Sequence, residues 1–354
     1  MKNLMQTFSG EKVFITGHTG FKGTWLTRLL HTHGADVTGY SLPTNHLNVH
    51  FNSLGLENQI RHMTGDVNAF GELRDALLET KPKFIFHLAA QALVRDSYLD
   101  PVETFQTNVM GGVNLLQAVR ATNSVRAVVF VTSDKCYQNQ EWVWGYRETD
   151  LLGGKDPYSA SKAAAEIVFH SFYESFFKGS HRIGIGTARA GNVIGGGDWS
   201  NDRIIPDCIR NLEAGKPIEL RNPSATRPWQ HVLEPLSGYL TLAKKLHDSP
   251  ATWNGSWNFG PKSSEVRNVK QIAQMVIKHF GKGDIKILDN LDTSTPEAHL
   301  LQLNCEKANS ELNWHPRWDV DKALEMTANW YKKVGSGDPV DKVTDAQIKE
   351  YVGS

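Results

Sequence analysis

Two short segments carry residue types that can act together on an alcohol. The first is Ser133-Asp134-Lys135, and the second contains Tyr158 and Lys162. Tyr158 and Lys162 are four residues apart, and residues at this spacing lie on the same face of a helix. An ammonium group beside a phenol lowers the pKa of the phenol. Tyr158 is therefore predicted to accept a proton from a hydroxyl group while a hydride leaves the same carbon atom.

The segment Ser133-Asp134-Lys135 supplies an acid and an amine beyond what the oxidation of an alcohol requires. It therefore indicates a second acid–base step on the oxidised substrate. Two simpler interpretations stay open at this point. In the first, Lys135 is a solvated loop lysine, and in the second, Asp134 only caps a turn.

A glycine-rich segment near the N-terminus indicates a dinucleotide site. Residues 12–16 form a short apolar run rich in β-branched side chains, which predicts a buried strand, and the apolar pattern that follows predicts a helix. Between them, residues 17–23 have the spacing G-x-x-G-x-x-G, which differs from the commoner G-x-G-x-x-G. We expect Gly17 to permit a tight turn, Gly20 to let a diphosphate approach the backbone, and Gly23 to allow close packing of helix on strand.

Strand-like and helix-like segments alternate along the first half of the chain. This alternation predicts an α/β fold, a Rossmann-type doubly wound parallel sheet with helices on both faces. Gly17, Asp66, Ala89, Ser133 and Asn192 all follow expected strands, so they should meet at one edge of the sheet. Further strands are expected at residues 36–41, 59–64, 83–88, 126–132 and 182–189, and long helices at 101–120 and 158–176.

The regular alternation weakens after about residue 195. We therefore expect residues 1–195, with later returning segments, to form the cofactor-binding domain, and residues 196–354 to form mainly a smaller, mixed α/β substrate-binding region that caps the site. The polar tail from residue 335 carries no recognisable chemical signal. In this region, helices are expected at residues 202–212, 235–246, 269–280 and 320–331, and short strands near 218–220, 257–259 and 285–288.

The composition excludes several classes of partner. Among the 354 residues, 38 Lys and Arg balance 38 Asp and Glu, so no net charge indicates a nucleic-acid or membrane partner. The three cysteines and fourteen histidines show no metal-ligand spacing, so no metal is expected. The cysteine usage fits a reducing compartment. Neither a signal peptide nor an apolar run long enough to span a membrane is recognised, so we expect a cytoplasmic protein.

Together these segments resemble the extended short-chain dehydrogenase/reductase family over roughly residues 10–335. Within it, the chain is similar to the nucleotide-sugar 4,6-dehydratases. Asp134-Lys135, where relatives usually have Asp-Glu or Glu, is associated with the enzymes that act on CDP-glucose. The motifs that carry the resemblance are GHTGFKG (17–23), HLAAQ (87–91), NVMGGVNLL (108–116), TSDKCY (132–137), YSASK (158–162), RAGNVIGGGDW (189–199) and RPWQHV (227–232).

The resemblance implies NAD as the cofactor and CDP-glucose as the substrate. Tyr158, assisted by Lys162 and Ser133, then oxidises C4 of the glucose, and the hydride passes to NAD. Lys135, with a neutral amine, removes the C5 proton, and Asp134 protonates the departing 6-hydroxyl. The hydride returns to C6, so that NAD is regenerated. The product, CDP-4-keto-6-deoxyglucose, belongs to deoxysugar biosynthesis for lipopolysaccharide and O-antigen.

The resemblance also implies which residues bind cofactor and substrate. Residues 39–43, where an acid commonly holds the cofactor ribose, contain neither an acid nor an arginine, so NAD is expected to bind more loosely than usual. Arginine suits phosphate, although a surface ion pair is the simpler role for any one arginine. The implied cofactor-binding residues are Gly17, Thr19, Gly20, Phe21, Lys22, Gly23, Asp66, Val67, Leu88, Ala89, Ala90, Thr132, Tyr158 and Lys162, and the substrate-binding residues are Gln91, Asn192, Arg203, Arg227, Asn258 and His299.

Two other classes of function stay open. One is a nucleotide-sugar 4-epimerase or ketoreductase, against which the pair Asp134-Lys135 argues. The other is a non-catalytic NAD-binding regulator, against which Tyr158 and Lys162 argue. Relatives pair the helices at residues 101–120 and 158–176 across a two-fold axis into a four-helix bundle, so a homodimer or homotetramer is expected.

Overall fold

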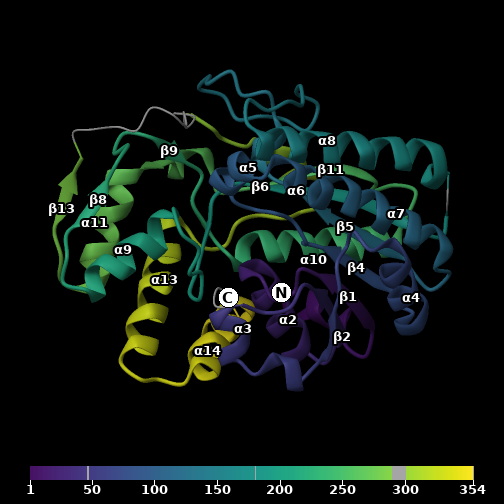
Figure 1. Ribbon diagram of the computed structural model, residues 1–354, viewed down its shortest axis with the longest axis horizontal. Helices are drawn as coiled ribbons and strands as arrows, with labels where there is room; N and C mark the ends of the chain where they lie inside the picture. The colour runs from purple at the N-terminus through teal and green to yellow at the C-terminus, as the bar shows by residue number, and fades with distance from the viewer. Residues whose placement is uncertain (46–47, 180, 289–299, 354) are drawn as a thin grey trace.

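The centre of the molecule is a seven-stranded parallel sheet with the strand order β11-β6-β5-β4-β1-β2-β3. The computed structural model describes residues 1–45, 48–179, 181–288 and 300–353 (Figure 1). The predicted Rossmann-type α/β fold is confirmed. The strands are Lys12–Thr16 (β1), Asp36–Ser41 (β2), Arg61–Thr64 (β3), Phe84–His87 (β4), Ala127–Val131 (β5), Gly184–Ala190 (β6) and Gly255–Phe259 (β11).

Helices cover both faces of this sheet, which explains why its central strands β1, β4 and β5 are apolar along almost their whole length. In β1, Phe14 packs into the core on one face, whereas Val13 and Ile15 pack into the core on the other. The first face is covered by α4 (Phe70–Thr80), α7 (Gly111–Ala121) and α8 (Pro157–Phe172), and the second by α2 (Phe21–Thr32) and α10 (Leu233–Asp248).

The seventh strand comes from the part of the chain that was expected to cap the site. β11 pairs in parallel with β6, and its Trp257 and Phe259 are buried in the core. Helix α10, which precedes β11, packs against β5 and β6. The sequence predicted a short strand at residues 257–259 but gave no indication of the sheet that it joins.

The two long helices predicted at residues 101–120 and 158–176 each contain a π-helical turn. The first divides into α6 (Pro101–Phe105), η2 (Gln106–Met110) and α7, and the second into α8 and η4 (Tyr173–Phe177). Helix α8 begins where it does because the Asp156 carboxylate accepts a hydrogen bond from the Ser159 N–H and proline occupies the first helical position. This cap fixes the first turn of α8, where Tyr158 lies.

The C-terminal half forms a second, smaller group of helices and short strands beside the sheet (Figure 1). Its strand pairs are β7 with β10, β8 with β13, and β9 with β12; the last pair alone is antiparallel among these described pairs. The elements are β7 (Val193–Ile194), α9 (Ile204–Glu213), β8 (Ile218–Leu220), β9 (Thr226–Arg227), β10 (Gln230–His231), η5 (Ser263–Glu265), β12 (Arg267–Asn268), α11 (Val269–Phe280), β13 (Ile285–Ile287), α12 (Glu306–Glu311) and α13 (Val320–Gly335).

The polar tail is an ordered part of the fold. It forms α14 (Val340–Gly353), which packs against α13 and against α3 (Val49–Ser53). Its Val343, Ile348 and Tyr351 are buried, so the helix is amphipathic although the segment is polar overall. The remaining elements are α1 (Lys2–Gln6), η1 (Leu56–Asn58), α5 (Val94–Leu99) and η3 (Asp134–Cys136).

Candidate active site

The residues proposed for acid–base chemistry lie together at the carboxyl end of β5. Ser133 directly follows this strand and caps η3: its hydroxyl accepts a hydrogen bond from the Lys135 N–H at 3.3 Å and donates one to Asp134 Oδ1 at 3.0 Å. Tyr158, in the first turn of α8, approaches the same serine hydroxyl, which lowers the pKa of its phenol. Ser133 therefore links the oxidation residue Tyr158 to the Asp134-Lys135 pair.

Tyr158 is buried, and burial raises the pKa of its phenol to about 12. The sequence predicted the opposite direction, with Lys162 as the cause. In the structure, Lys162 Nζ lies 5.9 Å from the centre of the tyrosine ring, and burial lowers the pKa of Lys162 itself to about 8. The prediction was wrong for the chain without ligands because loss of hydration opposes the charged form of both groups.

Asp134 is placed as a buried acid. Only 3% of its surface is exposed, and burial raises the pKa of its carboxyl group, although Lys135 and the Ser133 hydroxyl act in the opposite direction. Its Oδ2 has no hydrogen-bond partner among the described residues and faces Gly191, where an added Cβ would lie 3.1 Å away. The helical turn is capped by Ser133 rather than by Asp134, which argues against the turn-cap interpretation of Asp134.

The glycine loop has the close contacts that were expected of it. Gly17 has a φ of +70°, and a Cβ there would lie 2.7 Å from the Ala89 nitrogen in the segment after β4. A Cβ at Gly23 would lie 2.1 Å from the Gly17 carbonyl oxygen. Gly20 is the N-cap of α2, so the N-terminus of this helix is available to an anionic group. The loop therefore fits a dinucleotide diphosphate.

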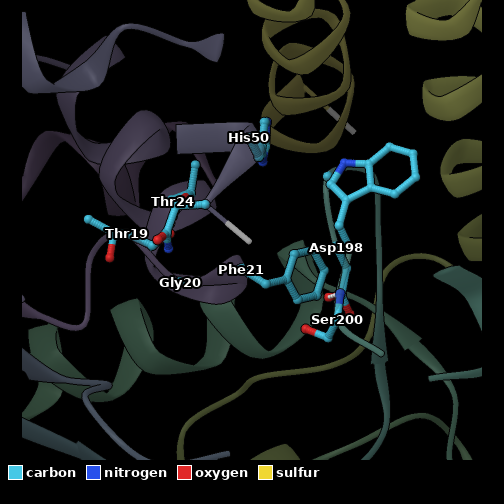
Figure 2. A pocket seen from close by; sticks show the side chains of 10 residues that line it. Thr19, Gly20, Phe21, Thr24, His50, Asp198 and Ser200 are labelled. Carbon is cyan, nitrogen blue, oxygen red and sulfur yellow. Dashed lines mark hydrogen bonds between the residues drawn. The ribbon is translucent and has the colours of Figure 1, made fainter. Parts of the chain in front are cut away.

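A pocket of about 90 Å³ lies at this helix N-terminus (Figure 2). Two segments outside the glycine loop contribute to it: residues 48–50 around α3, which belong to none of the quoted motifs, and residues 197–200 after β7, of which 197–199 end the motif RAGNVIGGGDW (189–199). Neither contains a recognisable motif for cofactor binding, and only the tertiary fold brings them to the glycine loop. The lining residues are Thr19, Gly20, Phe21, Thr24, Asn48, His50, Gly197, Asp198, Trp199 and Ser200.

Lys22, in the glycine loop, belongs to the charged groups of the cleft. Burial lowers the pKa of its ammonium group to about 8, and the nearby charges of Arg203 and Lys162 add to this effect, while Asp134 opposes it. The structure thus brings Lys22, Lys162, Arg203 and Asp134 close enough to influence one another. Sequence reasoning had grouped Lys22 with the cofactor loop alone.

The other predicted cofactor residues lie along the carboxyl edge of the sheet. Thr19 donates a hydrogen bond at 3.2 Å to Ser41, the last residue of β2, at the strand end near which an acid commonly holds a ribose. Asp66 follows β3, where its Oδ1 accepts a hydrogen bond from the Asn68 N–H at 2.9 Å. Val67 is buried, Leu88, Ala89 and Ala90 follow β4 half-buried, and Thr132 donates to Glu166.

Of the predicted substrate residues, Arg227 and Arg203 act electrostatically on the acid–base groups. Arg227 is buried and lowers the pKa of Asp134, while Arg203 opposes the raised pKa of Tyr158. Arg203 also forms an ion pair with Asp198 at 3.1 Å. Asn192 follows β6 at the same edge of the sheet and is half-buried.

The side chains of Gln91 and Asn258 make hydrogen bonds within the protein. The Gln91 amide group contacts the Leu93 backbone and the Thr104 hydroxyl, so it stabilises a turn. Asn258 is fully buried, donates to two backbone carbonyl oxygens, and accepts a hydrogen bond from the Tyr137 hydroxyl at 2.8 Å. These contacts give both amides a structural role. His299 lies outside the described residues.

A buried ion pair behind the site was missed by sequence reasoning. The Glu166 carboxylate, on α8, accepts two hydrogen bonds from Arg189 of β6, at 2.8 and 2.9 Å, and one from Thr132 at the end of β5. Arg189 also donates to the hydroxyl of Tyr137, the residue after η3, at 2.7 Å. The pair therefore joins α8, which carries Tyr158, to both ends of the segment that carries Asp134. Only its tertiary contacts identify it, because Glu166 and Arg189 belong to no motif for ion pairing.

The described residues include neither a candidate metal site nor a helix suited to span a membrane. Among them, no group of three or more His, Cys, Asp or Glu side chains has an arrangement that suits a metal ion. None of the helices in the described part of the chain combines the length and the apolar character needed to cross a membrane.

Comparison with known proteins places this geometry in a family. A model of the family described as GDP-mannose 4,6 dehydratase matches residues 14–327. CDP-glucose 4,6-dehydratase of Salmonella typhimurium is 44% identical over 357 residues, covering 100% of this chain and 98% of that protein. dTDP-glucose 4,6-dehydratase of Xanthomonas campestris is 26% identical, covering 90% of this chain and 92% of that protein.

Solved structures share the fold. dTDP-glucose 4,6-dehydratase of Bacillus anthracis, in complex with NAD, superposes with a TM-score of 0.76 at 22% identity, covering 91% of this chain and 97% of that one. The corresponding enzyme DesIV of Streptomyces venezuelae, also with NAD bound, gives a TM-score of 0.78 at 22% identity, covering 93% and 99%. From the family model, the Salmonella relative and the site geometry, the chain belongs to the nucleotide-sugar 4,6-dehydratase family of extended short-chain dehydrogenases/reductases.

Proposed function

We propose that this protein is an NAD-dependent hydro-lyase that converts CDP-glucose to CDP-4-keto-6-deoxyglucose and water. The observation that carries the proposal is a buried carboxyl group, Asp134, whose free oxygen shares a cleft with Lys135, Ser133 and Tyr158. An alcohol dehydrogenase or an epimerase needs no such additional acid–base pair. The full-length similarity to a CDP-glucose 4,6-dehydratase supports the same choice of nucleotide and sugar.

The cofactor is proposed to bind along the glycine loop. Its diphosphate would lie at the N-terminus of α2, its adenosine beside Thr19 and Asp66, and its nicotinamide ribose beside Tyr158 and Lys162. Bound NAD would supply a reversible hydride acceptor for C4 and the hydride for C6. Glycine at position 17 lets the loop lie close to the segment after β4, because a Cβ there would clash with the Ala89 backbone.

Oxidation of C4 depends on Tyr158 and Ser133. Tyr158 takes the proton from the 4-hydroxyl group as the C4 hydride leaves. The Ser133 hydroxyl is placed to donate a hydrogen bond to O4, an interaction that strengthens as the carbonyl forms. Burial raises the pKa of Tyr158 to about 12 in the chain without ligands, so its phenol is protonated near neutral pH. The positive charges of Lys162 and of an oxidised nicotinamide ring would favour the phenolate that accepts this proton.

Elimination of water depends on Lys135 and Asp134. The new ketone acidifies the C5 proton, which the Lys135 amine removes. Asp134, whose protonated form is favoured by burial, donates its proton to the 6-hydroxyl, which leaves as water. Lys135 then returns a proton to C5. The half-buried position of Lys135 directly after Asp134 allows the two groups to reach adjacent carbons of one sugar.

Arg227, Arg203 and Asn192 are proposed to hold the diphosphate of the nucleotide-sugar. The guanidinium groups offer paired N–H donors that match phosphate oxygens. The ion pair of Arg203 with Asp198 fixes its direction in the cleft. A cytoplasmic location is part of this proposal, since the three cysteines are unpaired and buried and both NAD and nucleotide-sugars are cytoplasmic metabolites.

The test of this proposal is incubation with NAD and, separately, CDP-, UDP-, dTDP- and GDP-glucose. We expect CDP-glucose to be converted to a 4-keto-6-deoxy sugar, detected by its absorbance in strong base. Turnover of the other three nucleotide-sugars should be at least tenfold lower, because the loss of one set of hydrogen bonds changes affinity by about tenfold. Conversion of CDP-glucose to its C4 epimer without loss of water, or the absence of turnover with every nucleotide, would refute the proposal.

We also propose that the protein forms a homodimer through α6, η2, α8 and η4. These elements pack side by side and expose large apolar side chains to solvent. Val102 is 63% exposed, Phe105 38%, Met110 50%, Ile167 59% and Phe176 49%. A second copy related by a two-fold axis would cover this surface and complete a four-helix bundle. Two such dimers would make a homotetramer.

Ile167→Asp is expected to shift the dimer towards monomer, because the carboxylate would lose hydration in the covered surface. The mass measured by light scattering at micromolar concentration should fall by about half. Val143→Asp, a matched change at a 70% exposed residue of the loop after η3, should leave the mass unchanged. A monomeric wild-type protein would contradict the proposal.

A further inference from the structure

We propose that His50 and Trp199 donate hydrogen bonds to phosphate oxygens of the bound dinucleotide, and that Thr344 of the C-terminal helix α14 sets His50 for this role. The inference rests on the proposed function in that it takes NAD as the cofactor. It adds donors from α3 and from the loop after β7, which belong to no glycine-loop motif.

The first observation is where His50 lies. It is 2% exposed, and its ring packs against Trp25 of α2 and Trp330 of α13, with centroid distances of 5.4 and 5.2 Å. It lines the pocket at the N-terminus of α2 together with Gly197, and a Cβ at Gly197 would meet its Cγ and Nδ1 at 2.4 and 2.5 Å. Figure 2 shows His50 and Phe21 among the residues that line this pocket.

The second observation assigns the proton of the His50 ring. The Trp330 indole N–H, which can only donate, forms a hydrogen bond with the Thr344 hydroxyl oxygen at 3.0 Å. Of the two side-chain contacts of the Thr344 hydroxyl among the described residues, His50 Nε2, 3.1 Å away, is the one that can accept its hydrogen, so we assign the hydrogen to this contact. Burial lowers the pKa of His50 to about 3, so the ring is neutral. With Nε2 as the acceptor, we assign the single ring proton to Nδ1.

The third observation is that this proton has nothing to bind. His50 Nδ1 is buried and has no hydrogen-bond partner among the described residues, and the same is true of the indole nitrogen of Trp199. Both side chains line the same pocket, at the end of α2 that favours negative charge. A buried donor without an acceptor costs free energy, so two such donors at a helix N-terminus indicate an anionic acceptor.

The charges around the pocket are compatible with a phosphate group. Asp198 is the one carboxylate among the lining residues, and it is already compensated. Its Oδ2 forms the ion pair with Arg203, and its Oδ1 accepts a hydrogen bond from the Ser200 N–H at 3.1 Å. Lys22 and Arg203 add positive charge nearby. A dinucleotide diphosphate on the glycine loop would therefore meet donors and cations rather than an uncompensated anion.

Helix α14 holds His50 in place from behind. Besides the Thr344 contact, Asp345 accepts two hydrogen bonds from Arg28 of α2, both at 2.7 Å. These contacts connect α14 to α2, whose N-terminus faces the pocket, and to α3, which carries His50. Thr344 is thus a positioning residue, because it touches His50 and not the pocket.

The test is calorimetric titration of the full-length protein with NAD and with inorganic phosphate. His50→Phe keeps a ring of similar shape and removes Nδ1, and the dissociation constant for NAD should rise about tenfold. Trp199→Phe removes the indole N–H together with part of the ring of this half-buried side chain and should act in the same direction. Thr344→Val should weaken NAD binding less, because it leaves the His50 ring in the pocket.

The matched control is His231→Phe. His231 is also fully buried and packs on Trp25, with a centroid distance of 5.7 Å, but it does not line the pocket. It should bind NAD like the wild type. Unchanged NAD affinity in both His50→Phe and Trp199→Phe would overturn the proposal, and so would an equal loss in His231→Phe. If phosphate binding alone weakens, the pocket takes free phosphate and the assignment to the dinucleotide is wrong.

This result is separable from the proposed function. CDP binding, measured in the same variants, should be unchanged and shows that the fold is intact. A wild-type protein that binds NAD but does not convert CDP-glucose would refute the proposed reaction, while the effect of His50→Phe on NAD affinity would still decide the role of this pocket.

Discussion

Tyr158→Phe is expected to bind NAD and CDP-glucose nearly as the wild type does and to lose turnover by about 10²–10⁴-fold, the usual contribution of a general acid–base group. The substitution removes the hydroxyl group that accepts the C4 proton and leaves the buried ring in place. Turnover is measured by product formation at saturating substrate, and the two affinities by titration.

Its pH dependence gives a second readout. Burial raises the pKa of Tyr158 to about 12 in the chain without ligands, so the phenolate fraction increases as the pH rises through neutrality. We therefore expect kcat/KM of the wild type to increase with pH over this range and that of Tyr158→Phe to lose the dependence. Tyr173→Phe, a half-buried tyrosine in η4, is the matched control and should retain full activity. If Tyr158→Phe keeps near-wild-type turnover, another group is the base.

Lys135→Met should separate the oxidation from the elimination. It removes the amine and approximately keeps the length of the side chain, so Tyr158 and Ser133 can still oxidise C4. After a single turnover, the absorbance of reduced nicotinamide should therefore persist. The rate at which the C5 hydrogen exchanges with deuterated water should fall by about 10²–10⁴-fold. Exchange at the wild-type rate would show that another residue removes the C5 proton.

Asp134→Asn provides the matched comparison at the neighbouring residue. The amide keeps the shape and the hydrogen bond from Ser133 but cannot donate a carboxylic proton. Loss of the 6-hydroxyl should slow, while C5 exchange by Lys135 continues. Equal effects of the two variants on exchange would mean that Asp134 and Lys135 do not have the separate roles assigned to them.

The sequence predicted the sheet well because strands buried on both faces leave a clear apolar pattern. The expected segments 12–16, 36–41 and 218–220 agree with the observed strands in every residue, and 269–280 agrees with α11. The π-helical turns at Gln106–Met110 and Tyr173–Phe177 were not predicted, since the apolar periodicity continues through them. The place of β11 in the main sheet also depends on pairing over a long sequence distance, which local patterns do not record.

The site was predicted where residues lie in one motif and missed where they meet by tertiary folding. The strand-end rule placed Ser133 and Asp134 at one edge of the sheet, and in the structure Tyr158 of α8 approaches the same serine. It did not identify His50 or Glu166, whose contacts come from segments up to hundreds of residues away. The direction of the Tyr158 pKa was wrong for a related reason: a four-residue spacing shows a neighbouring charge but not the extent of burial.

The central claim is that one active site oxidises C4, removes water across C5 and C6, and reduces C6 with the same hydride. The most direct measurement uses CDP-glucose that carries deuterium at C4, with catalytic NAD, and locates the label in the product by NMR. The account predicts a 4-keto-6-deoxy product with the deuterium at C6 of the same molecule. Deuterium retained at C4 of a product that still has its 6-hydroxyl, or lost to the NAD pool without appearing at C6, would contradict it.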